Sequence, residues 1–382
     1  MKNITILLCV LLLLFTGLLT YHWFTRSDEA VASKLYPIAE HVTSTYVHHE
    51  REYETSLTLG AIGDILIHDW VYEDARERAT DGTYDFHPML EQVAPLLREP
   101  DLLLANQESV LGGAELPVSN YPLFNSPTEV GDALIEAGVD IVSTANNHSI
   151  DKGEKGVQAS IRYYESTGLP YVGSYKSFED QSELRVLEKN KVAVAYLSYT
   201  ASTNGIPVPT GKEYLVNVVD REAISEEIQR AKEAADIVVM SIHWGQEYIR
   251  YPNSYQEDLA SFLISEGVDI IFGHHPHVLQ PIEWIESENG NKGLVVYSLG
   301  NFLSGQMWDY KDIGGLVEVD ISKSFKEGQV HTEITDVRFH PTYVYSKHLR
   351  SYLVVPLQDA EAYGVSNAVA LNQEILEHML PQ

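Results

Sequence analysis

Three histidines lie within four positions, at His274, His275 and His277, directly after an apolar run that ends at Gly273. Imidazole is the commonest side-chain metal ligand, and Pro276 restricts the loop that holds these rings. The β-branched residues before Gly273 predict a short buried strand, whose carboxyl end is where ligands bind in open α/β sheets. The cluster therefore predicts a metal site. Taken alone, the segment also fits a turn with three surface histidines.

Five further strand-like runs end in polar side chains of types that bind metals. Because such strand ends meet at one edge of a layered sheet, we expect their side chains to converge. Carboxylate, amide and imidazole ligands without sulfur suit one or two Mn, Fe or Zn ions. A carboxylate that bridges two such ions supports hydrolytic chemistry at neutral pH. The candidate residues at these strand ends are Asp64, His68, Asn106, Glu108, Asn147, His148, His243, Glu247 and Asn301.

Each candidate also has a purely structural interpretation. Asp64 and Asn147 are residue types that occur in turns and caps. His243 stands beside Trp244 and fits a packed core histidine. Glu247 and Asp151 are better explained as residues that orient a ligand or start a helix than as ligands. The metal prediction therefore depends on convergence of several strand ends, and not on any single residue.

The elements that must position these side chains alternate between strand and helix. Ser126 and Pro127 predict a helix start, and Gly138 predicts its end. Residues 254–265 repeat this design, with Gly267 as the stop. Alternating apolar residues at 314–345 predict antiparallel strands. Strand-helix-strand alternation implies a layered α/β domain. The predicted buried strands are residues 57–63, 102–105, 140–144, 192–197, 237–242, 270–272 and 294–297.

Composition restricts the function of the chain. It has 382 residues, with 26 Lys and Arg against 55 Asp and Glu, and a formal net charge of −29. Such a surface repels phosphate backbones, which argues against nucleic-acid binding and against a broad electrostatic hold on anionic lipid. Cys9 is the only cysteine, so the chain has no intramolecular disulfide and no multi-thiolate zinc site.

Residues 4–24 contain no Asp, Glu, Lys or Arg and are about long enough to span a bilayer as one helix. We expect an uncleaved amino-terminal anchor with the rest of the chain outside the cytoplasm. The alternative is a cleaved signal peptide with Ala30-Val31-Ala32 as the small-residue site. In both cases the chain is expected to act outside the cytoplasm, and the uncleaved form is a single-pass protein of the cell membrane.

Six motifs follow one another in a specific order. They are Gly-Asp at 63–64, Asn-x-Glu at 106–108, Asn-Asn-His at 146–148, His-Trp-Gly at 243–245, Gly-His-His-Pro-His at 273–277 and Ser-Leu-Gly-Asn-Phe at 298–302. Over about residues 57–345, this order resembles the CapA family of bacterial capsule and poly-γ-glutamate synthesis proteins. That family is similar to the calcineurin-like metallophosphoesterases. The resemblance implies a four-layer α/β/β/α sandwich of two mixed sheets with a two-metal site.

The resemblance also implies roles for individual residues. It assigns metal binding to Asp64, Glu108, Asn147, His243, His275 and His277, with Glu108 in the bridging position, and catalytic roles to His148 and Asp64. The phosphoesterases have Asp-x-His in the first motif, whereas His68 stands four positions after Asp64, so His68 departs from the pattern. The partner of His277 is His274 or His275, and alternation along an extended loop favours His275. Possible additional residues are His68, His274, Asn106, Asn301 and Glu247.

The predicted organisation is an anchor at 1–26, a linker at 27–55, the CapA-like domain at 56–345 and a carboxyl-terminal helix and tail at 346–382. The resemblance implies a role in capsule or poly-γ-glutamate synthesis or export, with a metal-dependent hydrolase-type site. The alternative is a non-catalytic accessory or scaffold subunit whose degenerate phosphoesterase pocket binds the polymer. The expected partners are an anionic polymer such as poly-γ-glutamate or capsular polysaccharide, the membrane, and a membrane synthesis or export complex.

Overall fold

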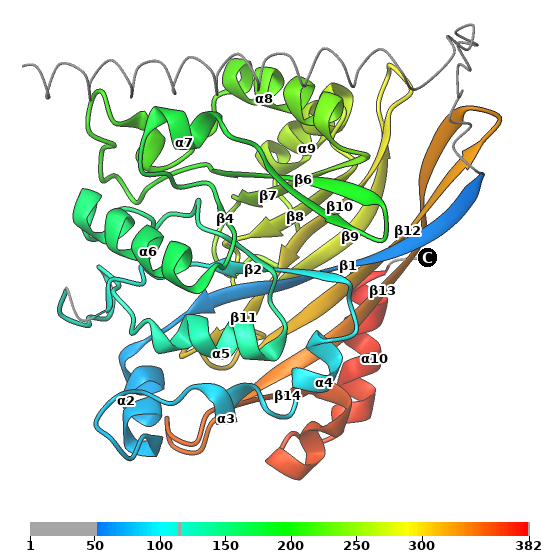
Figure 1. Ribbon diagram of the computed structural model, residues 1–382. Helices are drawn as coiled ribbons and strands as arrows, with labels where there is room; N and C mark the ends of the chain where they lie inside the picture. The colour runs from blue at the N-terminus through cyan, green and yellow to red at the C-terminus, as the bar shows by residue number, and fades with distance from the viewer. Residues whose placement is uncertain (1–51, 114–115, 381–382) are drawn as a thin grey trace, which may run out of the picture. The chain divides into compact units, whose positions relative to one another are not determined.

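The computed structural model of the protein describes residues 52–113 and 116–380 (Figure 1). The predicted membrane anchor and almost all of the predicted linker lie outside the described residues. Within the described ranges, no helix is both long and apolar enough to cross a membrane. The first strand begins at Tyr53, close to residue 56, where the sequence places the start of the domain.

Sheet one contains eight strands, of which seven follow the order β14-β13-β12-β1-β2-β3-β4. Its central strands are parallel, and the eighth strand, β11, runs parallel to β1. The strands β12, β13 and β14 continue the sheet in antiparallel fashion, as predicted for residues 314–345. The bounds are β1 (Tyr53–Leu66), β2 (Leu102–Gln107), β3 (Ile141–Ser143), β4 (Tyr171–Val172), β11 (Asn301–Ser304), β12 (Ile313–Lys326), β13 (Gln329–Tyr345) and β14 (Leu353–Pro356).

Sheet two contains six strands in the order β5-β6-β7-β8-β10-β9. Its four central strands are parallel, and the two edge strands, β5 and β9, are antiparallel to their neighbours. Both sheets are therefore mixed, as predicted. The bounds are β5 (Arg185–Lys189), β6 (Val192–Thr200), β7 (Ile237–His243), β8 (Ile270–His274), β9 (Leu279–Glu286) and β10 (Lys292–Leu299).

Successive side chains of a strand point to opposite faces, so a strand buried on both faces is apolar throughout. The inner faces of the two sheets share one core, which contains Leu59 and Leu104 of sheet one and Val239 and Phe272 of sheet two. The carboxyl-terminal helix α10 (Ala368–Met379) adds to this core. The packing of these faces holds the carboxyl ends of both sets of strands in place.

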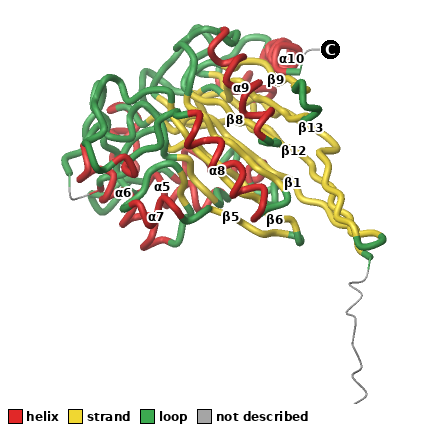
Figure 2. Tube along the Cα trace, turned by 90° about the horizontal axis from the view of Figure 1, so that it is seen from above, coloured by secondary structure: helices red, strands yellow, loops and turns green. Residues whose placement is uncertain are grey.

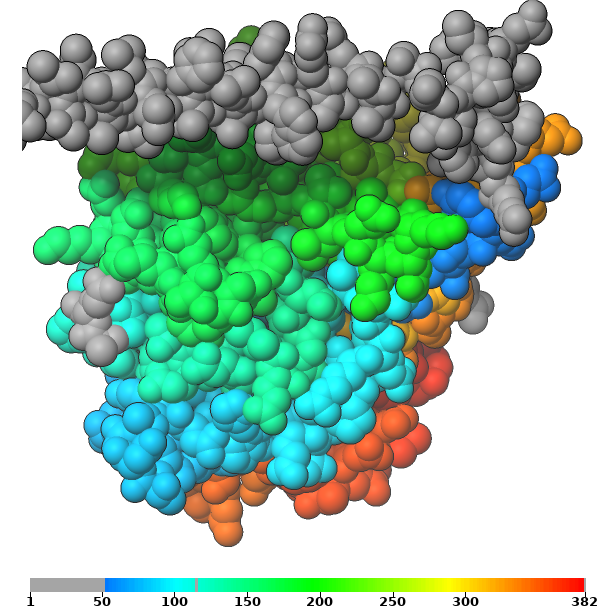
Figure 3. Space-filling model, in the orientation of Figure 1, coloured from blue at the N-terminus to red at the C-terminus, as the bar shows by residue number. Residues whose placement is uncertain are grey.

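Helices cover the outer faces. Helices α2 (Asp69–Arg78), α3 (His87–Leu90), α4 (Ala94–Leu97), α5 (Glu129–Ala137) and α6 (Gly153–Thr167) share a core with sheet one. Helices α8 (Arg221–Ala234) and α9 (Ser254–Glu266) share a core with sheet two and lie along its strands in Figure 2. In the space-filling view of Figure 3, segments coloured cyan to green, which include α5 and α6, form the surface over sheet one. The shorter helices are α7 (Phe178–Ser182), η2 (Glu213–Leu215) and η3 (Leu357–Tyr363).

The same turn starts a central strand in each sheet. Helix α5 ends at Gly138 and helix α9 ends at Gly267, both in the left-handed conformation, with φ of 119° and 112°. The N–H of each glycine donates to carbonyls three and four residues earlier, which satisfies the end of the helix. The predicted stops at both glycines are confirmed.

Each of four strands is preceded by an aspartate that accepts the first free N–H of the neighbouring strand. Such bonds satisfy backbone donors at the edge of the ladder, where no strand partner remains. The bonds run from Thr58 N to Asp101 (3.0 Å), from Leu103 N to Asp140 (2.8 Å), from Ala193 N to Asp236 (2.8 Å) and from Val238 N to Asp269 (2.8 Å).

The predicted start of α5 is displaced, whereas α9 begins at Ser254 as predicted. Helix α5 begins at Glu129, and Thr128 flanks it without a capping hydrogen bond from its side chain. The hydroxyl of Ser126 donates to Ser109 Oγ at 2.7 Å. In α9 the cap is Asn253, which forms a capping box with Gln256. Both helices keep their predicted place between the strands.

Candidate metal centre

The carboxyl ends of both sheets meet at one group of side chains. Asp64 in β1 is paired in register with Asn106 of β2 and with Asn301 of β11. Across sheet two, His243 of β7 is paired with His274 of β8. Strand register therefore places these polar side chains beside one another, and all five residues are buried.

Three groups of possible ligand atoms lie within this cluster, and the atoms of each group are within 4.8 Å of one another. Glu108 belongs to two groups, which places its carboxylate between two possible ion positions. His275 and His277 also belong to two groups each. The groups are Asp64 with Glu108 and His277, Glu108 with His243 and His275, and Glu247 with His275 and His277.

Glu108 is fully buried, and neither carboxylate oxygen has a hydrogen-bond partner among the described residues. Its Oε1 lies 3.4 Å from His243 Nε2 and 3.8 Å from His277 Nε2. Burial and the nearby Asp64 carboxylate raise the pKa of Glu108 well above its usual value. A buried carboxyl group with free oxygens and imidazoles on two sides is arranged as a bridging ligand would be.

Asp64 has a different environment, because both of its oxygens are engaged. Oδ1 accepts from Asn106 Nδ2 at 2.8 Å, and Oδ2 lies 2.9 Å from His277 Nδ1. Burial alone would raise the pKa of Asp64, but the nearby His274 ring and the hydrogen bond with His277 lower it well below its usual value. Burial would also lower the pKa of His277, yet the charges of Glu108 and Asp64 raise it to about 9. Asp64 therefore orients His277 as well as facing the cluster.

Several other buried atoms in this cluster have no hydrogen-bond partner in the described part of the chain. An unsatisfied buried polar group costs about 1–3 kcal/mol, and most such groups in folded proteins are paired. Burial lowers the pKa values of His243 and of His275, that of His275 to about 4, which favours the neutral imidazole that binds metals. The donor set fits a divalent cation. The unpaired atoms are Asn147 Oδ1, His243 Nε2, His274 Nδ1 and Nε2, His275 Nδ1 and Asn301 Oδ1.

His148 lies beside this cluster with one ring nitrogen already engaged. Its Nδ1 is 2.7 Å from Asp151 Oδ2, which also accepts the Phe124 N–H at 2.7 Å. This carboxylate favours the tautomer with the proton on Nδ1 and leaves Nε2 to exchange a proton with another molecule. The interpretation of Asp151 as an orienting residue agrees with this contact.

Some of the predicted additional residues do not face the cluster as ligands. His68 lies in none of the three ligand groups; its Nδ1 is 3.0 Å from Leu66 O and 3.2 Å from Gly305 N, and its ring stacks on Trp70. The Asn301 amide nitrogen donates to the carbonyls of His277 (3.3 Å) and Lys311 (2.8 Å), so Asn301 ties two loops together. By contrast, the exposed Glu247 lies at the mouth of the cluster and belongs to the ligand group of His275 and His277.

Two residues near the cluster were not predicted. Asn147 Nδ2 donates to Asn204 Oδ1 at 3.3 Å, which leaves Asn147 Oδ1 free to face the cluster. Asn204 lies in the loop that follows β6, and no motif in the sequence marks it. Tyr248 lies with its ring centroid 6.1 Å from that of His277. Its position next to Glu247 is the only hint that the sequence provides.

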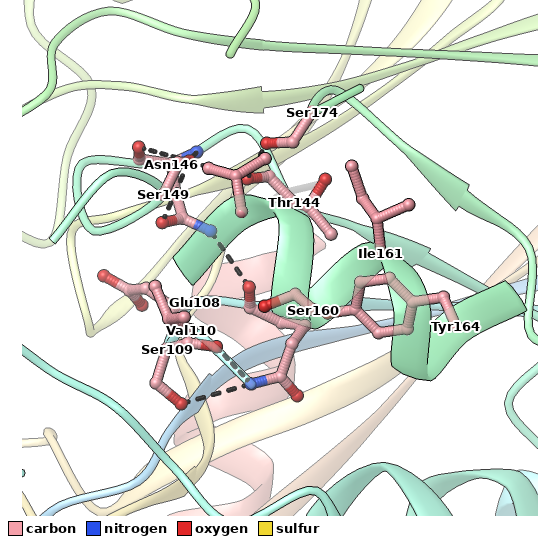
Figure 4. Close-up of a pocket in the computed structure, with 12 residues that line it drawn as sticks. Glu108, Ser109, Val110, Thr144, Asn146, Ser149, Ser160, Ile161, Tyr164 and Ser174 are labelled. Atoms are coloured by element: carbon pink, nitrogen blue, oxygen red, sulfur yellow. Dashed lines mark hydrogen bonds between the residues drawn. The ribbon is translucent and has the colours of Figure 1, made fainter. Parts of the chain in front are cut away.

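A small cavity lies behind Glu108 (Figure 4). Gln107, Ser160 and Tyr164 contribute to its wall, and its volume is about 20 Å³. Figure 4 shows the Glu108 carboxylate directed away from Tyr164. The cavity has room for one water molecule and is too small for a substrate. A substrate must therefore approach from the opposite side, where His275 and Glu247 are accessible.

Several similar proteins are named for bacterial capsule or polymer synthesis. The chain is 31% identical over 332 residues to the capsule biosynthesis protein CapA of Bacillus anthracis, covering 83% of this chain and 72% of the relative. It is 30% identical over 295 residues to the PGA biosynthesis protein CapA of Bacillus subtilis, covering 74% and 72%. A probable polyglutamine synthesis accessory protein of Mycobacterium tuberculosis is 24% identical, covering 48% and 49%.

Among solved structures, the calcineurin-like phosphoesterase YfkN of Bacillus subtilis matches with a TM-score of 0.43 and 15% identity, covering 85% of this chain and 98% of that chain. A hypothetical protein of Thermus thermophilus matches with a TM-score of 0.43 and 15% identity, covering 75% and 98%. The family model described as bacterial capsule synthesis protein PGA_cap matches residues 58–306. This match spans well over half of the chain, and the chain therefore belongs to the PGA_cap family of bacterial capsule synthesis proteins.

Proposed function

We propose that the chain is a membrane-anchored protein that acts outside the cytoplasm in capsule or poly-γ-glutamate synthesis or export. Its metal centre hydrolyses a phosphoester, or an amide in an anionic polymer. One observation carries the hydrolase proposal: unpaired buried oxygen and nitrogen donors surround Glu108, whose two oxygens are themselves unpaired. A protein that only scaffolds a complex has no physical need for such an arrangement.

The proposed ligands are Asp64, Glu108, Asn147, His243, His275 and His277, around one or two Mn, Fe or Zn ions. When bound, such ions polarise a substrate oxygen and lower the pKa of a coordinated water. Glu108 is shared by two of the three ligand groups, and Asp64 fixes the orientation of the His277 ring. Two mixed sheets that place ligands at their strand ends also support a metallophosphatase-like four-layer sandwich as the architecture of this site.

His148 handles the proton in this proposal. With Nδ1 held by Asp151, its Nε2 donates a proton to the leaving group of the substrate and regains it in the next cycle. The Asp151 carboxylate keeps the ring of His148 in one orientation. Asn147 stands next to His148 in the chain, so one loop supplies a proposed ligand and the proposed acid.

A non-catalytic accessory role is the second candidate. The name of the mycobacterial relative describes an accessory protein, and a chain with a net charge of −29 repels a polyanion without a local positive site. In this alternative, the same donors hold ions that bind carboxylates of the polymer, and no bond is cleaved.

Metal content and turnover distinguish these candidates. The wild type, Glu108→Gln and the exposed matched control Glu188→Gln are loaded with Mn, Fe or Zn, and bound metal and hydrolysis of bis-p-nitrophenyl phosphate and poly-γ-glutamate are measured. The hydrolase proposal predicts bound metal and turnover in the wild type and in the control, with loss of both in Glu108→Gln. Metal and polymer binding without turnover favours the accessory role, and a wild type that binds no divalent ion contradicts the metal centre.

The proposed topology has its own test. Protease added to intact protoplasts should remove the domain that follows residues 4–24, while the same treatment leaves a cytoplasmic marker intact. Recovery of the full-length chain from the soluble cytoplasmic fraction would contradict both the anchor and the extracytoplasmic location.

A further inference from the structure

Tyr248 stands at the accessible side of the metal centre with a strained backbone. Its φ is 68°, which is uncommon for a bulky residue, and its N–H donates to Pro276 O at 2.7 Å. This bond ties Tyr248 to the loop that carries His275 and His277. The side chain is half exposed, with 48% of its surface accessible to solvent. Strain of this kind persists where surrounding contacts fix it, and it often marks a binding site.

The phenol group of Tyr248 is held in one orientation. Gln306 Nε2 donates to the hydroxyl at 3.3 Å, and Gln306 Oε1 accepts from Asn301 Nδ2 at 3.2 Å. Asn301 also bonds to the carbonyl of His277 at 3.3 Å. One chain of contacts therefore links the phenol to the loop that carries His275 and His277. The exposed part of the Tyr248 ring is accessible to a substrate that approaches the metal centre.

Lys311 lies over the same ring, with its Nζ 5.3 Å from the centroid. The carboxylate partner in the structure is Asp309 at 3.3 Å, whose side chain is 90% exposed, so the pair is weak. The preceding residues Trp308, Asp309 and Tyr310 all have positive φ, at 64°, 52° and 66°. Three consecutive non-glycine residues in this conformation are strained, because each Cβ lies close to the following carbonyl oxygen. This strained turn fixes the start of the segment that carries Lys311.

Charge makes this position unusual. The chain carries a net charge of −29, yet an ammonium group stands at the opening of its proposed metal centre. Glu247 contacts the Tyr248 phenol at the same opening and would oppose an anion. Glu247 also belongs to the ligand group of His275 and His277, where a bound cation would neutralise it.

We infer that Lys311 and Tyr248 form an anion subsite, which holds a carboxylate or phosphate group of the substrate next to the group bound at the metal centre. The inference rests on the proposed function, because it places the substrate at that centre. Lys311 Nζ supplies the charge. The single O–H of Tyr248 is donated to the anion when a cation bound with His275 and His277 engages Glu247, which otherwise contacts this hydroxyl. Lys311 Nζ lies 5.3 Å from the centroid of the Tyr248 ring, and that centroid lies 6.1 Å from the centroid of His277. The proposal therefore places the group at Lys311 and the group at the metal centre on one substrate molecule.

The test compares Lys311→Gln with Lys326→Gln in the full 382-residue chain, purified in detergent and loaded with Mn. Lys326 is the matched control, because it lies at the far end of β12 in an exposed pair with Glu54. The probes are a fluorescein-labelled oligomer of γ-linked glutamate and a labelled polyphosphate of equal charge. Binding is measured by fluorescence anisotropy, and bound Mn is measured on the same samples.

Lys311→Gln should raise the Kd by about tenfold at low salt, and the difference should shrink as NaCl is added. Lys311→Arg should restore binding, Tyr248→Phe should weaken it by less, and Lys326→Gln should change it by less than about twofold. Bound Mn should stay unchanged in all variants. The probe that responds to Lys311→Gln identifies the anion as a carboxylate or a phosphate.

Equal losses in Lys311→Gln and Lys326→Gln would reduce the effect to overall charge and overturn the subsite. Binding unchanged in Lys311→Gln, or a Mn-loaded wild type that binds neither probe, would also overturn it. Failure of the proposed function looks different, because a wild type that retains no Mn contradicts the metal centre whatever the Lys311 variants do.

Discussion

In sheet one, the connection from α5 to β3 reads Gly138-Val139-Asp140, and in sheet two the connection from α9 to β8 reads Gly267-Val268-Asp269. In both, the glycine ends a helix in the left-handed conformation, and the aspartate accepts an N–H of the neighbouring strand at 2.8 Å. The same three residue types therefore start a central strand in each sheet.

The opposite ends of the strands differ in chemistry and in backbone. Sheet one supplies the oxygen donors Asp64, Glu108 and Asn147, none of which has a positive φ. Sheet two supplies imidazoles, and its His275 and His277 have φ of 96° and 56°. Common starts and different ends show that the scaffold is generic, while the site depends on two dissimilar halves. Those halves form one site only while the core between the sheets is intact.

Leu59→Ala would test this dependence with the largest expected effect. Leu59 of β1 lies in the core between the sheets, and Leu263 of α9 lies in the outer core of sheet two. Each Leu→Ala change should lower the free energy of unfolding by about 2–5 kcal/mol. Only Leu59→Ala should also weaken Mn affinity, because it loosens the contact between the halves. Chemical denaturation and metal titration below the melting temperature would measure both, and equal affinities in the two variants would contradict the dependence.

The two halves should also respond differently when a ligand is removed. Glu108 belongs to two ligand groups that involve different histidines, whereas His243 belongs to one. Glu108→Gln should therefore prevent the binding of both metal ions. His243→Ala should prevent the binding of one ion and leave the other bound. Loss of a ligand should reduce affinity at least as much as the roughly 10–100-fold loss that follows removal of an orienting residue. Elemental analysis gives the metal count, and a full count in Glu108→Gln would exclude a bridging role.

The inner part of the site was predictable because its residues follow strands. Asp64, Glu108 and His243 come directly at or after buried apolar runs, and the layering of α/β domains brings such positions together. The choice of His275 over His274 rested on an extended loop. The structure places His275 with His277 in one ligand group although both have positive φ, so that reasoning was wrong in its geometry.

The mouth of the site was not predictable from the sequence. Tyr248 and Lys311 meet through left-handed turns built from non-glycine residues, which no composition signal marks. The start of α5 was displaced from Ser126 to Glu129, and Ser126 instead forms a hydrogen bond with Ser109 of another segment, which the local pattern does not show. Strands can be predicted from the pattern of apolar residues within one segment. The residues at the mouth of the site and the first residue of a helix depend on contacts between segments, which that pattern does not show.

The shared aspartates should give the two sheets a common pH dependence. Burial raises the pKa of Asp269 to about 6 and also raises that of Asp140. A raised pKa in the folded state means that the fold favours the protonated form, so this contribution is full below about pH 4 and is lost as the pH rises through 6. The stability of Asp269→Asn relative to wild type should rise by about 2 kcal/mol between pH 4 and 7, measured by urea denaturation. Asp140→Asn should change in the same direction, and a difference that falls with pH would contradict the assignment.

The smallest effects should come from the glycines that begin the shared turn, and they should separate backbone strain from crowding. Gly290 has φ of 87° and no atom within 4 Å of the position that a Cβ would occupy, so Gly290→Ala should cost about 1 kcal/mol from strain alone. At Gly267 the new Cβ would meet Lys232 Nζ at 2.5 Å, but this flexible side chain can move aside. At Gly138 it would lie 3.1 Å from the Leu97 carbonyl oxygen, which belongs to the backbone. Thermal denaturation should therefore rank Gly138→Ala as the most destabilising, with Gly267→Ala close to Gly290→Ala. An unchanged melting temperature in Gly267→Ala would show that the left-handed backbone at this position does not disfavour alanine. The requirement for glycine would then differ between the turns of the two sheets.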